Sequence, residues 1–259
     1  MLKYIHIFIF KYILCSIEKG VKGVKNIFKN RKVLYLSTIF VVATLVFSIN
    51  SMLFVPVSSS DVETKTRTIV LDAGHGGEDG GAVSKCGIVE KDLNLAITMK
   101  VKEKLEDNNI TVILTRSEDI MLYSNAEAKL AKRKVEDINK RIEIVNSSNA
   151  DMLVSIHMNS FPQNYCKGWQ IFFAQNSKQG ELIAGYIQDS IKDYLEAENT
   201  RVPQSINNVK LVNKSKIPAI VVECGFLSND EEAQMLTTEE YQEKIANGIC
   251  KGIMNFYSE

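Results

Sequence analysis

TIVLDAGHGG, residues 68–77, is the stretch of sequence that decides the fold. Its first residues are mostly apolar and β-branched, which predicts a buried strand, and the glycines after Asp72 end that strand in a turn. Two similar apolar runs, Met152–Ile156 and Ala219–Val222, also stop at a titratable residue. Continuous runs of this kind are typical of strands that are buried on both faces of a parallel sheet.

Strands and helices alternate along the chain on either side of this stretch. Short apolar segments predict strands at Thr68–Asp72, Ile110–Thr115, Met152–Ile156, Trp169–Phe173, Val209–Val212 and Ala219–Glu223. Longer segments with helical periodicity predict helices at Glu90–Leu105, Asn125–Ser147, Glu181–Leu195 and Thr238–Tyr257. The alternation predicts an α/β fold, with a mainly parallel twisted sheet that is flanked by helices on both faces.

An uncharged segment precedes this domain. Residues 33–57 carry no charge, and about 20 apolar residues suffice to cross a bilayer as a helix. Residues 1–32 hold eight basic residues and one acid, so the positive-inside rule predicts that they stay in the cytoplasm. We expect residues 33–57 to be a transmembrane signal anchor, 58–66 a linker and 67–259 an extracytoplasmic domain. Cleavage near residues 58–60 would instead secrete that domain.

Charge and cysteine content argue against several classes of protein. Residues 33–259 carry a net charge of −7, so no nucleic acid is expected as a partner, since such binding needs a basic surface. The five cysteines are scattered and form no CxxC pair, which argues against a disulfide framework or a cysteine zinc knuckle. The sequence also lacks a P-loop and a Gly-x-Ser-x-Gly nucleophile motif.

His75 and His157 are the chemically distinctive residues of the domain. The chain has three histidines, and these two follow predicted strands, whereas His6 belongs to the basic N-terminal segment. Ligand sites of open α/β sheets gather beyond the carboxyl ends of the strands, so we expect the two imidazoles to lie near each other. Two imidazoles and one carboxylate form a recurrent catalytic zinc set with an open fourth position. The alternative for each histidine is a structural, hydrogen-bonded role.

Four acids are candidates for the carboxylate of such a set: Glu78, Asp79, Glu90 and Glu223. Glu90 opens a predicted helix, where an acid also complements the helix dipole. Glu223 closes a buried strand, where an acid costs several kcal/mol unless it is paired or metal-linked. Glu223 therefore suits either a general base of raised pKa or a buried ion pair. Asp72 is expected either to orient a ligand or to cap a turn.

Four ordered motifs carry a family resemblance: IVLDAGHGG at 69–77, EKDLNL at 90–95, ADMLVSIHMN at 150–159 and PAIVVECGFLSN at 218–229. Residues 67–257 resemble the zinc-dependent N-acetylmuramoyl-L-alanine amidases, the type 3 family of peptidoglycan amidases. The resemblance implies that His75, Glu90 and His157 bind Zn²⁺ and that Glu223 is the catalytic glutamate. Arg141 matches an arginine of the family, and we expect its role to be structural.

The resemblance also implies an activity. The family hydrolyses the amide bond between N-acetylmuramic acid and the L-alanine of the peptidoglycan stem peptide. A membrane segment without wall-binding repeats makes the chain most similar to the germination-specific, spore-cortex branch. The expected partners are peptidoglycan, the membrane through residues 33–57, and an activating protein of unknown identity. The alternatives are another zinc hydrolase of the wall, such as a peptidase or deacetylase, and a membrane-anchored wall-binding scaffold with a decayed site.

Overall fold

The computed structural model describes Tyr35, residues 39–44 and residues 66–259. The chain divides into two compact units, Met1–Thr64 and Lys65–Glu259. In the first unit, Tyr35 and residues 39–44 are helical. Among the described residues, none of the helices has the length and apolarity that crossing a bilayer requires. The basic segment 1–32, most of the predicted anchor 33–57 and most of the linker 58–66 lie outside the described residues.

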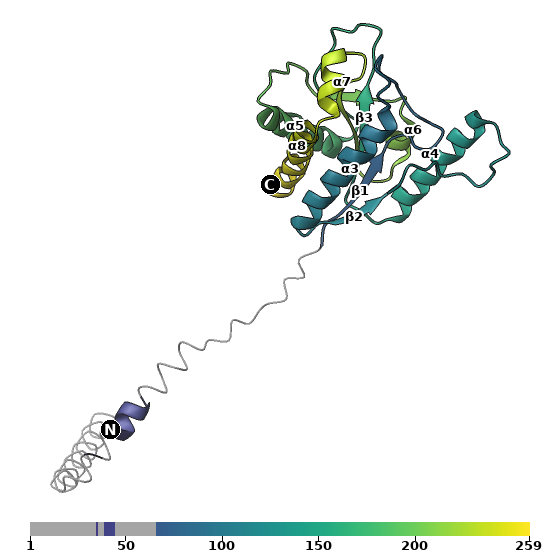
Figure 1. Cartoon of the computed structure of the whole chain (residues 1–259). Helices are drawn as coiled ribbons and strands as arrows, with labels where there is room; N and C mark the ends of the chain where they lie inside the picture. The colour runs from purple at the N-terminus through teal and green to yellow at the C-terminus, as the bar shows by residue number, and fades with distance from the viewer. Residues whose placement is uncertain (1–34, 36–38, 45–65) are drawn as a thin grey trace, which may run out of the picture. The chain divides into compact units, whose positions relative to one another are not determined.

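A six-stranded sheet forms the centre of the second unit (Figure 1). Its strands are β1 (Thr68–Ala73), β2 (Thr111–Leu114), β3 (Met152–Asn159), β4 (Gln170–Ala174), β5 (Gln204–Ile206) and β6 (Ala219–Phe226), in the order β2-β1-β3-β6-β4-β5. The strands β2, β1, β3 and β6 are parallel to one another, whereas β4 runs antiparallel to β6 and β5 parallel to β4. The predicted mainly parallel sheet is confirmed, with an antiparallel junction at β6–β4.

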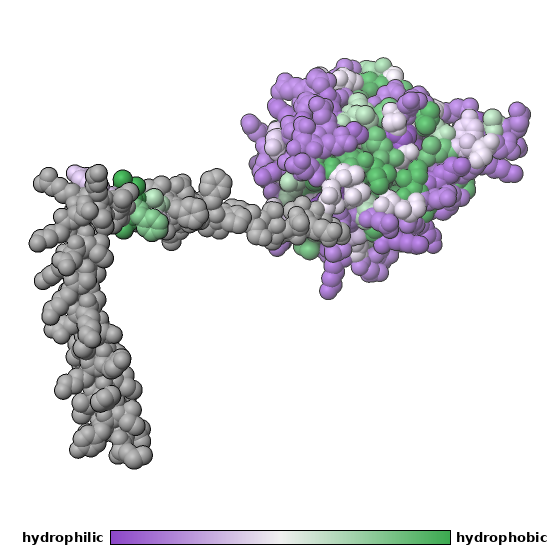
Figure 2. Space-filling model, turned by 90° about the horizontal axis from the view of Figure 1, so that it is seen from below, coloured by the Kyte–Doolittle hydropathy of each residue, from purple (hydrophilic) through white to green (hydrophobic). Residues whose placement is uncertain are grey.

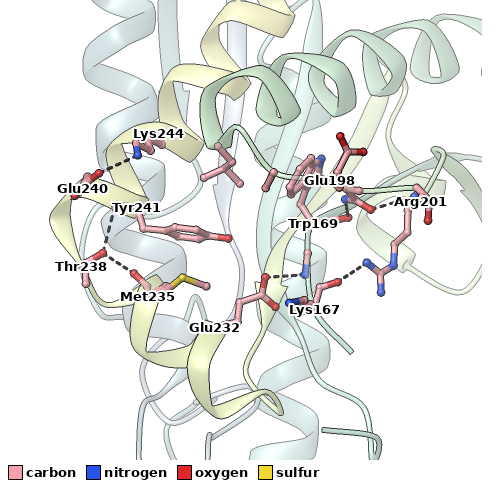
Figure 3. Close-up of a pocket in the computed structure, with 15 residues that line it drawn as sticks. Lys167, Trp169, Glu198, Arg201, Glu232, Met235, Thr238, Glu240, Tyr241 and Lys244 are labelled. Atoms are coloured by element: carbon pink, nitrogen blue, oxygen red, sulfur yellow. Dashed lines mark hydrogen bonds and ion pairs between the residues drawn. The ribbon is translucent and has the colours of Figure 1, made fainter. Parts of the chain in front are cut away.

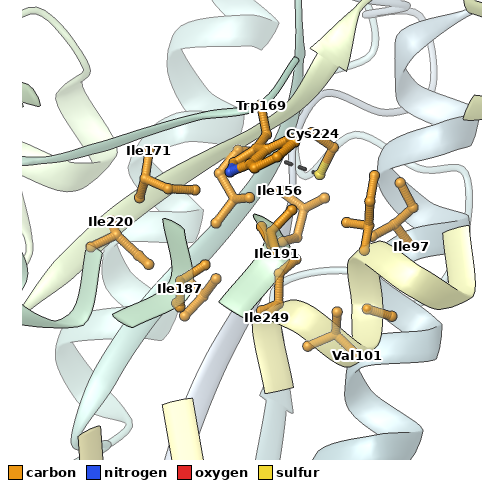
Figure 4. Close-up of a cluster of buried hydrophobic side chains, with 14 of the residues drawn as sticks. Ile97, Val101, Ile156, Trp169, Ile171, Ile187, Ile191, Ile220, Cys224 and Ile249 are labelled. Carbon is orange, nitrogen blue, oxygen red and sulfur yellow. Dashed lines mark hydrogen bonds between the residues drawn. The ribbon is translucent and has the colours of Figure 1, made fainter. Parts of the chain in front are cut away.

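Helices cover both faces of the sheet, as the alternating sequence predicts. They are α3 (Glu90–Asp107), α4 (Leu130–Ser147), α5 (Lys178–Leu195), α6 (Lys210–Lys214), α7 (Asp230–Leu236) and α8 (Glu239–Tyr257). The larger core lies under α3, α5 and α8, where isoleucines such as Ile97, Ile187 and Ile249 pack around Trp169 (Figure 4). A smaller core lies under α4 and α6 on the opposite face. Seen from below, the folded unit also has an apolar region that hydrophilic residues surround (Figure 2).

Local structure differs from the prediction in four places. The helix predicted from Asn125 begins at Leu130, because the side chain of Asn125 accepts the amide of Glu127 and closes a turn instead. The strand predicted at Val209–Val212 is wrong: that segment contributes to helix α6, whose Leu211 and Val212 are buried in the smaller core. The short strand β5 and the helix α7 were not predicted.

Candidate metal centre

The three predicted ligands meet at the carboxyl edge of the sheet. His75 lies in the loop after β1, His157 lies in β3, and Glu90 is the first residue of α3. Nε2 of His75 and Nδ1 of His157 lie 3.3 and 3.0 Å from the same atom, Oε1 of Glu90. One ligand atom from each residue lies within 4.8 Å of the other two. The fold therefore brings these groups together from three separate elements.

These separations suit a tetrahedral zinc site. Zinc binds histidine nitrogen and carboxylate oxygen at about 2.0–2.2 Å, which puts neighbouring ligand atoms of a tetrahedron roughly 3.4 Å apart. The nitrogen–oxygen distances of 3.3 and 3.0 Å are already close to that length. A protonated Nδ1 of His75 would donate to Oδ2 of Asp79, 3.0 Å away, and so leave the Nε2 lone pair facing Glu90. The donor set fits a zinc ion with one open position.

Several protein groups hold Glu90 in place. Its Oε2 accepts the amide of Ala82 at 2.8 Å, and its Oε1 accepts the amide of Met158 at 3.2 Å and the side chain of Asn94 at 3.3 Å. Burial favours the neutral acid, yet hydrogen bonds and charge from His157 and His75 hold the pKa of Glu90 well below its usual range. Glu90 is therefore an anion at neutral pH, as a metal ligand must be.

His75 adopts a backbone conformation that is uncommon for a residue with a side chain. Its φ of 60° lies in the left-handed region, which is unfavourable for residues with a side chain. Residues that adopt such conformations cluster at functional sites. Burial would lower the pKa of His75, but hydrogen bonds and charge from Glu90 and Asp79 raise it to about 9. A cation that binds Nε2 must therefore displace a firmly held proton, so metal binding and protonation compete.

A buried ion pair supports the loop that carries His75. Nη1 of Arg141 lies 2.7 Å from Oδ1 of Asp72, whose two oxygens also accept the hydroxyls of Thr115 and Ser155. Arg141 also donates to the carbonyl of Ala73, the last residue of β1, and to the carbonyl of His75 in the loop at 2.6 Å. Burial raises the pKa of Asp72, but the Arg141 charge and the two hydroxyls outweigh this effect and lower the pKa to about 2. These contacts confirm the structural role predicted for Arg141.

Two glycines allow the ligands to approach the backbone closely. A Cβ at Gly74 would overlap the ring of His157, and a Cβ at Gly81 would lie 2.5 Å from Oε2 of Glu90. Gly81 also has a φ of 71°, which glycine adopts without strain. Only a residue without a side chain fits at either position in this arrangement.

Glu223 lies beside His157 on the neighbouring strand. The two residues are paired in the parallel register of β3 and β6, so their side chains leave the same face of the sheet. The Oε2 atom of Glu223 is shielded from solvent and has no hydrogen-bond partner within the described part of the protein. Burial raises the pKa of Glu223 to about 7, with opposing contributions from His157 and Glu90. A carboxyl group of this kind can both accept and release a proton near neutral pH.

The remaining candidate acids have other contacts. Glu78 forms an ion pair with Arg133. One carboxylate oxygen of Asp79 faces Nδ1 of His75, and the other lies 2.5 Å from the ammonium of Lys134. Neither belongs to the group of side chains that converges around Glu90. Asp72 supports the loop through Arg141, which agrees more with an orienting role than with a simple turn cap.

Sequence reasoning missed three residues around the site: Asn94, Arg116 and Lys134. Asn94 follows Glu90 by four positions on α3 and donates to both Glu90 and the carbonyl of Gly74, so helical spacing offered a signal. Arg116 donates to the same carbonyl at 3.0 Å from the end of β2. Lys134 in α4 contacts Asp79, and no local sequence pattern predicts such a contact between distant segments.

Comparison with known proteins agrees with this geometry. A family model described as N-acetylmuramoyl-L-alanine amidase (Amidase_3) matches residues 69–255. The germination-specific N-acetylmuramoyl-L-alanine amidase of Bacillus subtilis is 37% identical over 193 residues, which cover 74% of this chain and 81% of that protein.

Solved structures of N-acetylmuramoyl-L-alanine amidases are also similar to this chain. The CwlD amidase from Clostridioides difficile, in complex with the GerS lipoprotein, is 40% identical with a TM-score of 0.73, covering 74% of this chain and 99% of that one. An N-acetylmuramoyl-L-alanine amidase from Clostridium difficile 630 is 31% identical with a TM-score of 0.66, covering 75% and 98%. The chain therefore belongs to the Amidase_3 family of peptidoglycan N-acetylmuramoyl-L-alanine amidases.

Proposed function

We propose that this amidase depends on Zn²⁺ held by His75, Glu90 and His157, with Glu223 as the catalytic glutamate. The observation that carries the proposal is the convergence of three donor atoms beside a buried carboxylate oxygen that has no partner among the described residues. When bound, zinc polarises a carbonyl group and makes a water molecule acidic near neutral pH. The distances between the donors support this choice of metal.

Residues of the chain supply the proton transfers. The Glu223 carboxylate accepts the proton of the water that attacks the lactyl carbonyl of N-acetylmuramic acid. It then returns that proton to the L-alanine nitrogen as the amide bond breaks. A pKa of about 7 suits both halves of this transfer. Asp79 and Asn94 keep His75 and Glu90 oriented while the bond is cleaved.

The substrate in this proposal is spore-cortex peptidoglycan, and the role is cortex maturation for germination. Similarity to the germination-specific amidase of Bacillus subtilis supports this substrate. The CwlD amidase of Clostridioides difficile forms a complex with the GerS lipoprotein, and that complex supports the expectation of an activating protein partner for this chain.

The location in this proposal is the outer face of the membrane. Residues 1–32 would stay in the cytoplasm, residues 33–57 would form a single-pass anchor, and a linker at 58–66 would lead to the catalytic domain at 67–259. The uncharged run and the basic residues before it support this arrangement. Protease added outside intact cells should degrade the catalytic domain, and the chain should fractionate with membranes. A soluble secreted product would indicate cleavage instead.

Mass spectrometry of digested peptidoglycan tests the activity and the metal together. Residues 58–259 should release stem peptides that begin with a free L-alanine amino terminus, and a chelator should stop the release until zinc is restored. Cleaved cross-links would indicate a peptidase, and released acetate would indicate a deacetylase. Activity that survives complete removal of metal would contradict the zinc assignment, and no product at all would favour the binding scaffold.

A further inference from the structure

Asn159 carries a side-chain amide that has no part in the metal centre described above. It is the half-buried last residue of β3, two positions beyond His157. Its Oδ1 accepts the amide of Ser160 at 2.9 Å, and the hydrogen bonds within residues 66–259 leave its Nδ2 without a protein partner. One end of this side chain is therefore fixed, and the other end is a hydrogen-bond donor for a ligand.

Asn159 lies on the same face of the sheet as the proposed catalytic groups. Side chains alternate along a strand, so Asn159 and His157 leave one face, while Met158 leaves the other and is buried in the larger core. Glu223 shares the face of His157 through the register of β3 and β6. Two residues of a strand advance roughly 6–7 Å, so the amide of Asn159 lies one short step beyond the pair of His157 and Glu223.

An aromatic ring lies beside this amide. Phe161 is 48% exposed, and its ring packs nearly edge-on against Phe226, with the ring centroids 5.2 Å apart. Phe226 is the register partner of Asn159 on β6, and adjacent strands lie about 4.8 Å apart. Single exposed apolar residues are common on proteins. The informative feature is the combination of an exposed ring with a free amide donor, because binding sites combine apolar walls with a few polar groups.

The loop that carries Phe161, residues 160–168, is held at both ends. At its start, the amide of Phe161 donates to the hydroxyl of Ser228 at 3.1 Å. At its other end, Arg201 donates to the carbonyl of Lys167, and Figure 3 shows the guanidinium turned toward that carbonyl. The position of the ring is therefore largely set before a ligand binds, which lowers the entropic cost of binding.

An amide donor next to an aromatic ring suits an N-acetylated sugar. The N–H group complements the carbonyl oxygen of an acetamido group, and a pyranose presents a face of C–H groups that packs on an aromatic ring. In N-acetylmuramic acid, the acetamido group and the lactyl ether occupy neighbouring carbons of the ring. The acetamido carbonyl is therefore close to the scissile amide, as Asn159 is close to His157 along β3.

We propose that Asn159 and Phe161 form the subsite for the muramic acid whose amide bond is cleaved. Nδ2 of Asn159 donates to the acetamido carbonyl, and the ring of Phe161 packs on the sugar. The inference rests on the proposed function, because it takes the scissile bond to lie beside His157 and Glu223. The subsite selects N-acetylated muramic acid over the de-N-acetylated sugar, whose ammonium group cannot accept a hydrogen bond.

Two matched substrates test this subsite. The full chain in detergent receives a purified disaccharide peptide of peptidoglycan, with the muramic acid either N-acetylated or carrying a free amine, and kcat/KM is measured for each. We expect the unchanged protein to prefer the acetylated substrate and Asn159→Ala to reduce that preference by about 5- to 30-fold, the range for loss of a hydrogen bond. Asn159→Asp retains the acceptor for the Ser160 amide and should reduce the preference at least as much, because a carboxylate attracts the ammonium group.

The preference is a ratio measured on one preparation, so it is independent of the fraction of protein that is folded or metal-loaded. Asn164→Ala is the matched control: its exposed side chain lies in the same loop, only its backbone carbonyl bonds to another described residue, and the ratio should not change. Phe161→Ala should leave the ratio unchanged but raise KM for both substrates by about 3- to 10-fold, since both contain the sugar ring.

An unchanged preference in Asn159→Ala would overturn the proposal. An equal loss of activity on both substrates would also overturn it, because that result is expected if Asn159 binds a carbonyl of the stem peptide instead. Calorimetric binding of the two compounds to Glu223→Gln, alone and combined with Asn159→Ala, gives the same ratio without turnover. Failure of hydrolysis by the unchanged protein thus counts against the proposed function, and equal ratios in the two binding experiments count against this inference.

Discussion

His75 and His157 reach one carboxylate from two different kinds of backbone. His157 lies in a regular strand, paired with Glu223 on one side and supported by the core beneath the sheet. His75 lies in a loop with a φ of 60°, held from below by Arg141 and the buried Asp72. Hydrogen bonding within a sheet thus places His157, and buried charge places His75. Two side chains that face the same carboxylate therefore depend on unrelated sources of rigidity.

The largest effect should follow removal of either ligand. We expect His75→Ala and His157→Ala each to lose nearly all bound zinc, because a three-ligand site with one donor missing holds the ion weakly. Metal analysis of the purified variants measures this. A full equivalent of zinc in either variant would show that the strand and the loop do not contribute equally to the site.

Replacing the strand neighbour of His157 should separate catalysis from metal binding. Glu223→Ala should retain zinc and the fold but lose roughly 10²- to 10⁴-fold in activity, the range for a general acid–base residue. Stem-peptide release and metal content are measured on the same preparation. Release at nearly the normal rate would remove Glu223 from the catalytic role.

Loss of the buried Arg141 charge should destabilise the protein, because this charge supports the loop that carries His75. Arg141→Met leaves Asp72 as an uncompensated buried anion, so we expect unfolding free energy to fall by about 3–5 kcal/mol. Urea denaturation measures the change, and Arg133→Met, which breaks an ion pair with the exposed Glu78, is the control with a small expected effect. If the two variants were equally stable, the ionic scaffold beneath the loop would not support His75.

A smaller effect should follow loss of the group that orients His75. Asp79→Asn removes the carboxylate that faces Nδ1, and we expect zinc affinity to fall by about 10- to 100-fold, as for other groups that orient metal ligands. Competition with a zinc-binding dye measures the affinity. Glu78→Gln, one residue away, should leave it unchanged, and equal losses in the two variants would point to a general charge effect.

The smallest expected effect concerns pH and stability in the metal-free protein. Asp72 has a lowered pKa of about 2, so it stabilises the fold above the unfolded value near 4 and loses that contribution as pH falls toward 2. Glu223 has a raised pKa of about 7, so its ionisation destabilises the fold as pH rises from about 4.5 through 7. Glu223→Gln should therefore raise the melting temperature by several degrees at pH 8 and change it little at pH 4. An equal shift at both pH values would contradict the raised pKa.

Sequence patterns predicted the strands of the site better than they predicted the loop that carries His75. Apolar runs located β1, β3 and β6, and the rule for carboxyl edges then placed His75, His157 and Glu223 near one another. The choice among four acids depended on the family resemblance, because a buried charge at the start of a helix and one at the end of a strand look equally plausible in sequence. The distances now single out Glu90 as the acid between the two imidazoles.

The conformation and contacts of the loop that carries His75 could not be predicted from local sequence patterns. The left-handed φ of His75 and the contact between Lys134 and Asp79 arise from segments far apart in the chain. The turn at Asn125 and the helix α6 were misread for a related reason, since a side-chain hydrogen bond and burial against the smaller core decided them.

The register of β3 and β6 has a consequence for how this enzyme can evolve. Adjacent strands lie about 4.8 Å apart, so the pairing of His157 with Glu223 fixes the spacing between a proposed metal ligand and the proposed proton acceptor. If either strand slipped by one residue, its member of the pair would turn to the opposite face of the sheet, away from the other. β6 accommodates an extra residue just after Glu223, so a change that shifts the register at this pair itself would separate the two side chains.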